Sequence, residues 1–187
     1  MFATYLHYGL LAALALAVIF AAATDIQRRQ IDNWLNLAIA AGAPLFWWSS
    51  GLSLWPGVAI QLGVALAAFA LLAGLFALRV MGGGDVKLLT ALALWIEPML
   101  FLQLLVVMAV AGGLLTIVMG TLHFLRRERE RLAIPYGVAI AIGALWVLGA
   151  NYLPESAYAG IYASDRGVDQ AGIAVSDPAG FPGSTRS

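Results

Sequence analysis

Three consecutive glycines precede a carboxylate at Gly82–Asp85, between two long apolar segments. Glycine has no Cβ, so this backbone can turn sharply or lie close against another chain. An acid at the start of an apolar helix is costly unless it has a partner or a chemical role. A second acid, Asp25, follows the first apolar segment. We therefore expect Asp25 and Asp85 to face each other, although they lie far apart in the sequence.

Two carboxyl groups that share a proton can hydrolyse a peptide bond. The ionised one takes a proton from water, and the protonated one polarises the scissile carbonyl. Because like charges at close range push two pKa values apart, such a dyad titrates as a pair. Each residue also has a non-catalytic interpretation. Asp85 would be a helix N-cap, a position where Asp is favoured, and Asp25 would pair with Arg28 or Arg29.

The elements that position these acids are membrane-spanning helices. Of the 187 residues, 62% are hydrophobic and 11% are charged, whereas soluble domains carry about 25% charged residues. Apolar runs long enough to cross a bilayer as helix recur along the chain. The absence of cysteine excludes a thiol nucleophile, a disulfide framework and cysteine-ligated zinc. We predict an all-α fold, a polytopic membrane helical bundle of about six transmembrane helices.

The predicted domain covers residues 1–153. From Pro154 the chain is rich in small and polar residues without periodicity, so 154–187 is predicted to be a disordered tail. The fourth apolar segment has 11 residues and rises only about 16 Å. Either it starts within the glycine turn and runs past Pro98, or it is short and the bilayer is thinned there. The predicted segments are Leu6–Ala23, Trp34–Trp48, Val58–Leu78, Val86–Ile96, Met99–Leu125 and Ile134–Leu153.

Basic residues predict the orientation of the bundle. Eight of the ten lysines and arginines fall in alternate loops of a six-span model, and the positive-inside rule assigns those loops to the cytosol. Both termini and the tail are then outside the cytosol, whereas Asp25 and Asp85 are at its face. The eight are Arg28, Arg29, Arg79, Lys87, Arg126, Arg127, Arg129 and Arg131.

Three motifs, in the same order, resemble those of type IV prepilin peptidases. Gly82–Asp85 fits the Gly-x-Gly-Asp motif of membrane-embedded aspartyl proteases. Residues Asp25 to Asn33 resemble the first-aspartate segment of the peptidases, and Ile134 to Ile140, followed by Gly143, is similar to their last span. The motifs cover nearly the whole chain except its tail. The chain most resembles the short form that serves Flp-type (tight-adherence) pili.

The resemblance implies an aspartic-type endopeptidase that cleaves prepilin leader peptides on the cytosolic side, typically after a glycine. It implies a multi-pass protein of the bacterial inner membrane, with an Flp-type pilin precursor and membrane lipid as partners and no nucleic acid. Asp25 and Asp85 would be catalytic. The residues expected at the substrate or in the active-site loops are Gly82, Gly83, Gly84, Asn33, Pro135, Tyr136 and Gly137.

Asp32 departs from the family pattern, which usually has proline at this position. It adds a third acid near the site and is an alternative to Asp25 as the first catalytic aspartate. The spacing to Asn33 and the position at the helix end favour Asp25. We expect Asp32 to cap the second helix, ahead of Trp34.

The sequence predicts no metal and no cofactor. His7 and His123 lie at opposite membrane ends, and no nucleotide-binding motif is present. Because the cysteine-bearing domain of the longer enzymes is absent, we expect cleavage without methylation of the new N-terminus. The sequence gives no indication of the oligomeric state.

Alternative functions are a presenilin-like intramembrane protease, a cation-coupled transporter or a non-enzymatic assembly subunit. The presenilin-like enzymes carry Tyr-Asp on the first catalytic helix, whereas Thr24 precedes Asp25 here. A transporter would favour acids at the bilayer midplane, inverted repeats and broken helices. The acids here lie at one membrane face without an evident repeat. The sequence leaves the assembly subunit open.

Overall fold

The computed structural model describes residues 2–126 and 136–152, and within these two ranges it contains helices and no strand. The prediction of an all-α membrane helical bundle is confirmed. Within the described ranges, three segments are long and apolar enough to cross a bilayer: Phe2–Arg28, Leu54–Ala77 and Pro98–Thr121. The elements are α1 (Phe2–Arg28), α2 (Asn33–Ser49), a short turn η1 (Leu54–Val58), α3 (Ala59–Ala77), α4 (Gly83–Ala93), α5 (Pro98–Arg126) and α6 (Tyr136–Tyr152).

The bundle is apolar on its outer surface as well as in its core. Leu66 on α3 and Val106 on α5 are 68% and 63% exposed. Helices that are hydrophobic on all faces belong to the inside of a large protein or to a membrane. Because these side chains are exposed in the bundle itself, its outer surface is apolar, as in a membrane helical bundle.

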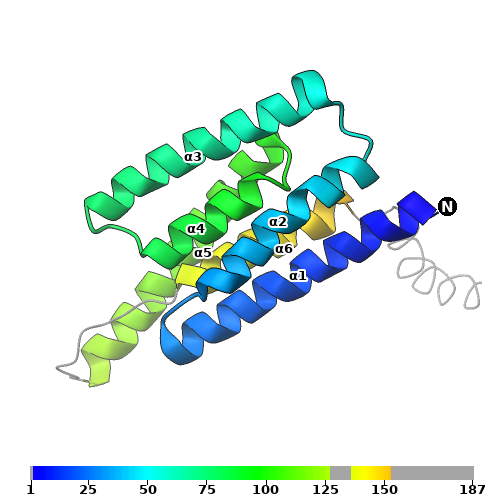
Figure 1. The fold of residues 1–187 in the computed structure, drawn as a ribbon. Coiled ribbons are helices and arrows are strands. Elements are labelled where there is room, and N and C mark those ends of the chain that lie inside the picture. The colour runs from blue at the N-terminus through cyan, green and yellow to red at the C-terminus, as the bar shows by residue number, and fades with distance from the viewer. Residues whose placement is uncertain (1, 127–135, 153–187) are drawn as a thin grey trace, which may run out of the picture. The chain divides into compact units, whose positions relative to one another are not determined.

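The shortest helix, α4, lies in the middle of the bundle (Figure 1). It packs against α2, α3, α5 and α6, while α1 packs against α2 and α6. Leu88, Leu89 and Leu92 of α4 have no exposed surface. The glycine run at the start of α4, and Asp85 in the first turn, therefore belong to a helix that lies in the interior.

The limits of α4 decide between the two predicted forms of the fourth segment. The helix starts within the glycines, at Gly83, but it ends at Ala93, and α5 begins separately at Pro98. It has 11 residues, so as helix it rises only about 16 Å. The fourth segment is therefore a short helix, and the prediction that it might run past Pro98 is wrong.

Side chains from neighbouring helices satisfy the carbonyl groups where α4 ends. Gln61 Nε2 donates hydrogen bonds to the carbonyls of Ala93 and Ile96, at 2.8 and 2.6 Å. Trp47 Nε1 donates to the carbonyl of Leu94 at 2.7 Å. The last carbonyls of a helix have no partner within the helix, and in a membrane each unpaired group is costly. These bonds make an early helix end possible inside the bundle.

Helices α5 and α6 pack closely at Gly143. A Cβ added there would lie 2.8 Å from the carbonyl oxygen of Leu104 and 3.2 Å from the backbone nitrogen of Met108. Small residues allow this close approach of two helices in membranes. The contact fixes α6 against the bundle and thereby positions the first turn of α6.

Candidate active site

Asp25 lies in the last turn of α1, which continues to Arg28, beyond the predicted end at Ala23. Its side chain is buried, with 7% of the residue exposed. Oδ2 of Asp25 accepts a hydrogen bond of 2.8 Å from the backbone N–H of Gly137. This N–H belongs to the first turn of α6, where helix N–H groups lack internal partners and favour a negative charge. The start of α6 therefore holds the Asp25 carboxylate.

Gly137 leaves no space for a side chain beside Asp25. A Cβ added to Gly137 would lie 2.8 Å from Oδ2 and 2.9 Å from Cβ of Asp25. Any other residue would have to displace the carboxylate or the helix. Tyr136, the preceding residue, lines a cavity together with both aspartates. Pro135, which was predicted with them, lies outside the described residues.

Asp85 is the third residue of α4, and Gly82 occupies the N-cap position. The interpretation of Asp85 as the N-cap is therefore wrong. The Asp85 carboxylate instead accepts a backbone hydrogen bond from Gly82, as the third residue of a helix does in a capping box. A Cβ on Gly82 would lie 2.9 Å from Oδ2 of Asp85. Asp85 is 8% exposed, so its carboxyl group is held in a nearly buried position.

The structure brings Asp25 and Asp85 together at two cavities. Both residues line a cavity of about 380 Å³, together with the 82–84 glycines and the loop between α1 and α2. Both also line a cavity of about 670 Å³, bounded by the end of α3 and by Tyr136. The two carboxyl groups are close enough for the charge of Asp25 to act on Asp85. A substrate in either cavity would reach both carboxyl groups.

Gly83 and Gly84 lie against neighbouring elements of the chain. A Cβ on Gly84 would lie 3.2 Å from Cβ of Ile31, and one on Gly83 would lie 3.3 Å from Cε2 of Phe76. Both contacts are tight for real side chains. The approach of a substrate strand to Gly82 and Gly84 remains a prediction. Close packing within the chain already accounts for the small residues at Gly83 and Gly84.

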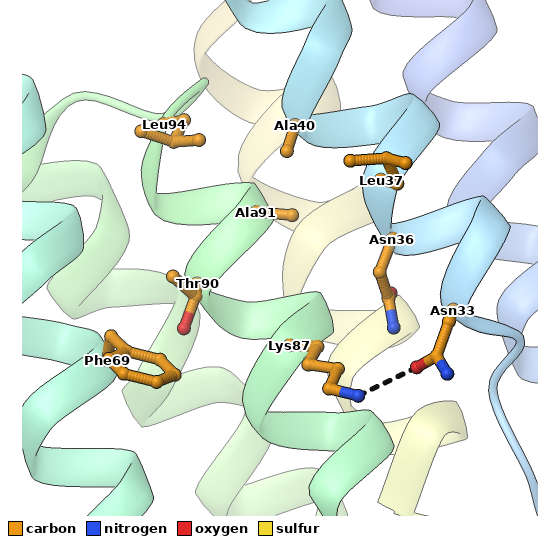
Figure 2. A pocket seen from close by; sticks show the side chains of 9 residues that line it. All are labelled: Asn33, Asn36, Leu37, Ala40, Phe69, Lys87, Thr90, Ala91 and Leu94. Carbon is orange, nitrogen blue, oxygen red and sulfur yellow. Dashed lines mark hydrogen bonds between the residues drawn. The ribbon is translucent and has the colours of Figure 1, made fainter.

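Asn33 begins α2 and contacts α4 through its side chain. Its Oδ1 accepts a hydrogen bond of 2.8 Å from Nζ of Lys87 (Figure 2). Asn33 also lines the 380 Å³ cavity with Asp25 and Asp85. The bond connects the beginning of α2 to the first turns of α4 and keeps both near the aspartates.

Asp32 occupies the N-cap position of α2, but its side chain makes no capping hydrogen bond. Only its backbone carbonyl accepts bonds, from the N–H groups of Leu35 and Asn36. The predicted N-cap position of Asp32 is therefore confirmed, but its side chain makes no capping bond. The carboxylate lies 3.9 Å from Nη2 of Arg28, and Asp32 lines the 380 Å³ cavity with the other two acids. Asp25 has no such ion pair among the described residues, so its predicted pairing with Arg28 or Arg29 is not observed.

Two arginines at the cavities have an unfavourable backbone conformation that sequence reasoning missed. Arg29 and Arg79 have φ angles of 53° and 59°, and both line the 670 Å³ cavity. Each follows a helix, at a position where glycine is the usual residue. The sequence could have indicated this conformation, because arginine follows each of these helices at a position where glycine is usual.

Sequence reasoning also missed Asn36, a buried polar residue on α2. The signal was an amide in an apolar segment, one helical turn after Asn33. Among the residues that the structure describes, no group of three or more histidines, aspartates or glutamates could hold a metal ion. The paired carboxyl groups are suited to acid–base chemistry on a bound substrate and a water molecule.

Comparison with known proteins adds independent evidence. Residues 12–117 match the model of the type IV leader peptidase family. The match covers more than half of the chain and includes both aspartates and the glycine run, whereas Gly137 lies beyond it. No curated protein and no solved structure matches the chain. Two of the three motifs lie within the matched residues, and the third, from Ile134 to Gly143, lies beyond them. The match confirms the resemblance to this family, and the chain belongs to the type IV leader peptidase family.

Proposed function

We propose that this chain is a membrane-embedded aspartic endopeptidase that removes the leader peptide of Flp-type prepilins at the cytosolic face of the bacterial inner membrane. The family supports a leader peptidase. The aspartic mechanism is supported by one observation: Asp25 and Asp85, from α1 and α4, line the same two cavities. The Flp-type substrate is supported by the likeness of the three motifs to the short form of the enzyme.

The mechanism uses one ionised and one protonated carboxyl group. The ionised carboxylate removes a proton from water, and the water oxygen attacks the carbonyl carbon of the scissile bond. The protonated carboxyl donates a hydrogen bond to the carbonyl oxygen as negative charge develops there. A proton then passes to the leaving amine, and the C–N bond breaks. The N–H of Gly137 supports the negative charge of Asp25 during this cycle.

The basic residues support cleavage at the cytosolic face. Arg29 and Arg79 line a cavity with both aspartates, and Lys87 lies two residues after Asp85 in α4. Cytosolic loops of membrane proteins carry an excess of lysine and arginine. The end of the bundle that carries the aspartates would then face the cytosol, with membrane lipid around the helices.

The test is cleavage of an Flp-type precursor in membranes that contain this chain and no other leader peptidase. We expect the wild-type chain to shorten the precursor and the new N-terminus to follow a glycine. Asp25→Asn and Asp85→Asn should leave the precursor intact at matched protein levels. Absence of cleavage by the wild-type chain would favour the assembly subunit. Cleavage by either variant at the wild-type rate would overturn the aspartic mechanism.

A further inference from the structure

A further cavity, of about 410 Å³, lies outside the pair of aspartates. Helices α2 and α3 each pack on α4, and residues from all three line this space (Figure 2). Leu37 and Ala40 come from α2, Phe69 comes from α3, and Ala91 and Leu94 come from α4. The cavity is therefore an apolar groove between α2 and α3, with α4 at its base.

One side chain of this groove is buried without a partner. Asn36 is 5% exposed, and within the described residues neither its Nδ2 nor its Oδ1 has a hydrogen-bond partner. Figure 2 shows its amide directed towards the space between Lys87 and Asn33. An unpaired buried amide destabilises a fold. An apolar residue of similar size would suit the folded chain better, which indicates that the amide serves a ligand.

The groove lies next to the cavity that contains the two aspartates, because one residue belongs to the lining of both. Asn33 lines both the groove and the 380 Å³ cavity that contains Asp25 and Asp85. Its bond to Lys87 Nζ crosses from α2 to α4 at this point. A chain whose scissile bond lies between the two aspartates can therefore extend past Asn33 into the groove.

The chemistry of the groove selects its occupant. The Lys87 ammonium is bonded to Asn33, and the Thr90 hydroxyl donates to the carbonyl of Val86. The Asn36 amide remains, with the two N–H donors of Nδ2 beside the acceptor Oδ1. A peptide backbone offers the complementary pair, but only where it is not helical, because helical N–H and C=O groups bond to each other. The apolar walls require apolar side chains on that peptide.

We propose that Asn36 is a substrate-binding residue. Its amide pairs with backbone groups of the apolar segment of the precursor, which lies extended in the groove beside the scissile bond. In the membrane, an extended backbone needs such partners because water is scarce. This inference rests on the proposed function and names the part of the substrate that the groove binds.

The first test compares Asn36→Leu with the wild-type chain in cleavage of a precursor peptide. Loss of one or two hydrogen bonds should raise KM roughly three- to tenfold and change kcat less than about twofold. The thermal midpoint should stay equal or rise, because the variant removes an unsatisfied amide. Asn151→Leu is the matched control, since Asn151 bonds within α6 at its other end, and its KM should not change. An unchanged KM in Asn36→Leu would overturn the proposal.

The second test locates the contact on the substrate. A series of precursor peptides carries one ester in place of one backbone amide along the apolar segment, so that each lacks a single N–H donor. With the wild-type chain, one ester position should lower kcat/KM roughly three- to tenfold. With Asn36→Leu the same ester should have no effect. Equal sensitivity of both chains, or an effect of Asn36→Leu that depends only on the lipid headgroups of the vesicles, would contradict a backbone contact.

A third measurement separates this inference from the proposed function. A photo-crosslinking residue in place of Leu37, in the Asp85→Asn chain, should capture the apolar segment of the precursor without cleavage. If the precursor is captured but the wild-type chain does not cleave it, the proposed peptidase function is refuted and the proposed substrate-binding groove is supported. If the wild-type chain cleaves the precursor but no capture occurs, substrate binding in the groove is refuted and the proposed peptidase function is supported.

Discussion

The two ends of α4 differ in how well their polar groups are satisfied. At the C-terminal end, the side chains of Gln61 and Trp47 donate hydrogen bonds to backbone carbonyls that have no partner within the helix. The N-terminal end contains a buried acid that shares its cavities with a second acid. Near it lie arginines with left-handed backbones and an unpaired amide at Asn36. One end of the helix is therefore organised for stability. The other end retains features that cost stability, and we propose that these features carry out the chemistry.

The largest effect should come from the aspartates at the N-terminal end. We expect Asp25→Asn and Asp85→Asn each to lower the cleavage rate about 10³-fold, because acid–base catalysis contributes on that scale. The double variant should be hardly slower than either single one, since residues that act together are not additive. The rate should also fall on both the acid and the alkaline side, with apparent pKa values that belong to the pair. The measurement is precursor cleavage in membranes across pH.

The two aspartates would not share a proton if the rate losses of the single variants added fully in the double variant. A cleavage rate that falls on only one side of the pH profile would lead to the same conclusion. The thermal midpoints of the variants serve as the control. Asparagine keeps the size of each side chain, so a large fall in either midpoint would attribute the lost activity to folding.

A methyl group at Gly137 tests how strictly the site depends on α6. In Gly137→Ala the new Cβ would lie 2.8 Å from Oδ2 of Asp25, so the carboxylate must move. A displacement of about 1 Å can lower a rate about 10²-fold, and we expect a loss of that size in kcat of precursor cleavage. Gly63→Ala on α3 is the matched control, because nothing lies within 4 Å of its added Cβ. Equal activity of both variants would mean that the Gly137 contact does not position Asp25.

A change at the C-terminal end of α4 should affect folding and leave the chemistry intact. Gln61→Leu removes the donor to the carbonyls of Ala93 and Ile96. Leaving buried carbonyls unpaired should lower the free energy of unfolding by about 2 kcal/mol. The cleavage rate per folded molecule should stay near the wild-type value. Stability is measured by thermal unfolding in detergent, and the rate by precursor cleavage. If Gln61→Leu greatly lowered the cleavage rate without lowering stability, the C-terminal end of α4 would not have a purely structural role.

The smallest effect is expected for the third acid of the cavity. Asp32→Asn removes a charge that lies 3.9 Å from Arg28, and exposed ion pairs contribute little. The side chain makes no capping bond that could be lost. Cleavage should stay within about twofold of the wild-type rate in the same membrane assay. If Asp32→Asn abolished cleavage while Asp25→Asn cleaved normally, Asp32 and not Asp25 would be the first catalytic aspartate.

Apolar periodicity and length were enough to predict the helices. Each described α-helix begins and ends within a few residues of a predicted segment, because apolar runs in a membrane protein form helices. The predicted segment ends at Ala23, where the apolar run ends, whereas α1 continues to Arg28. In the structure the Thr24 hydroxyl donates to the carbonyl of Ala21, three residues earlier. A polar side chain can thus satisfy itself on the helix backbone, so polarity alone did not mark the helix end.

The candidate site could be predicted where a single stretch carries the information. The glycine run and Asp85 stand out by composition, and the family match includes them. The missing information was in contacts between distant elements. The bond from Gly137 to Asp25 spans 112 positions, and the unpaired state of Asn36 depends on what α3 and α4 place around it. Such contacts join residues that are distant in the sequence, so they could be identified only from the three-dimensional structure.

The positive φ angles of Arg29 and Arg79 have a consequence for anyone who engineers this protein. Each left-handed residue costs about 1 kcal/mol or more, and glycine would adopt the same conformation without that cost. A selection for expression or heat resistance alone would therefore favour glycine at both positions. Both side chains belong to the wall of the 670 Å³ cavity. Thermostable descendants obtained in this way would lose positive charge beside the two aspartates first, so screens on this scaffold need an activity readout from the first round.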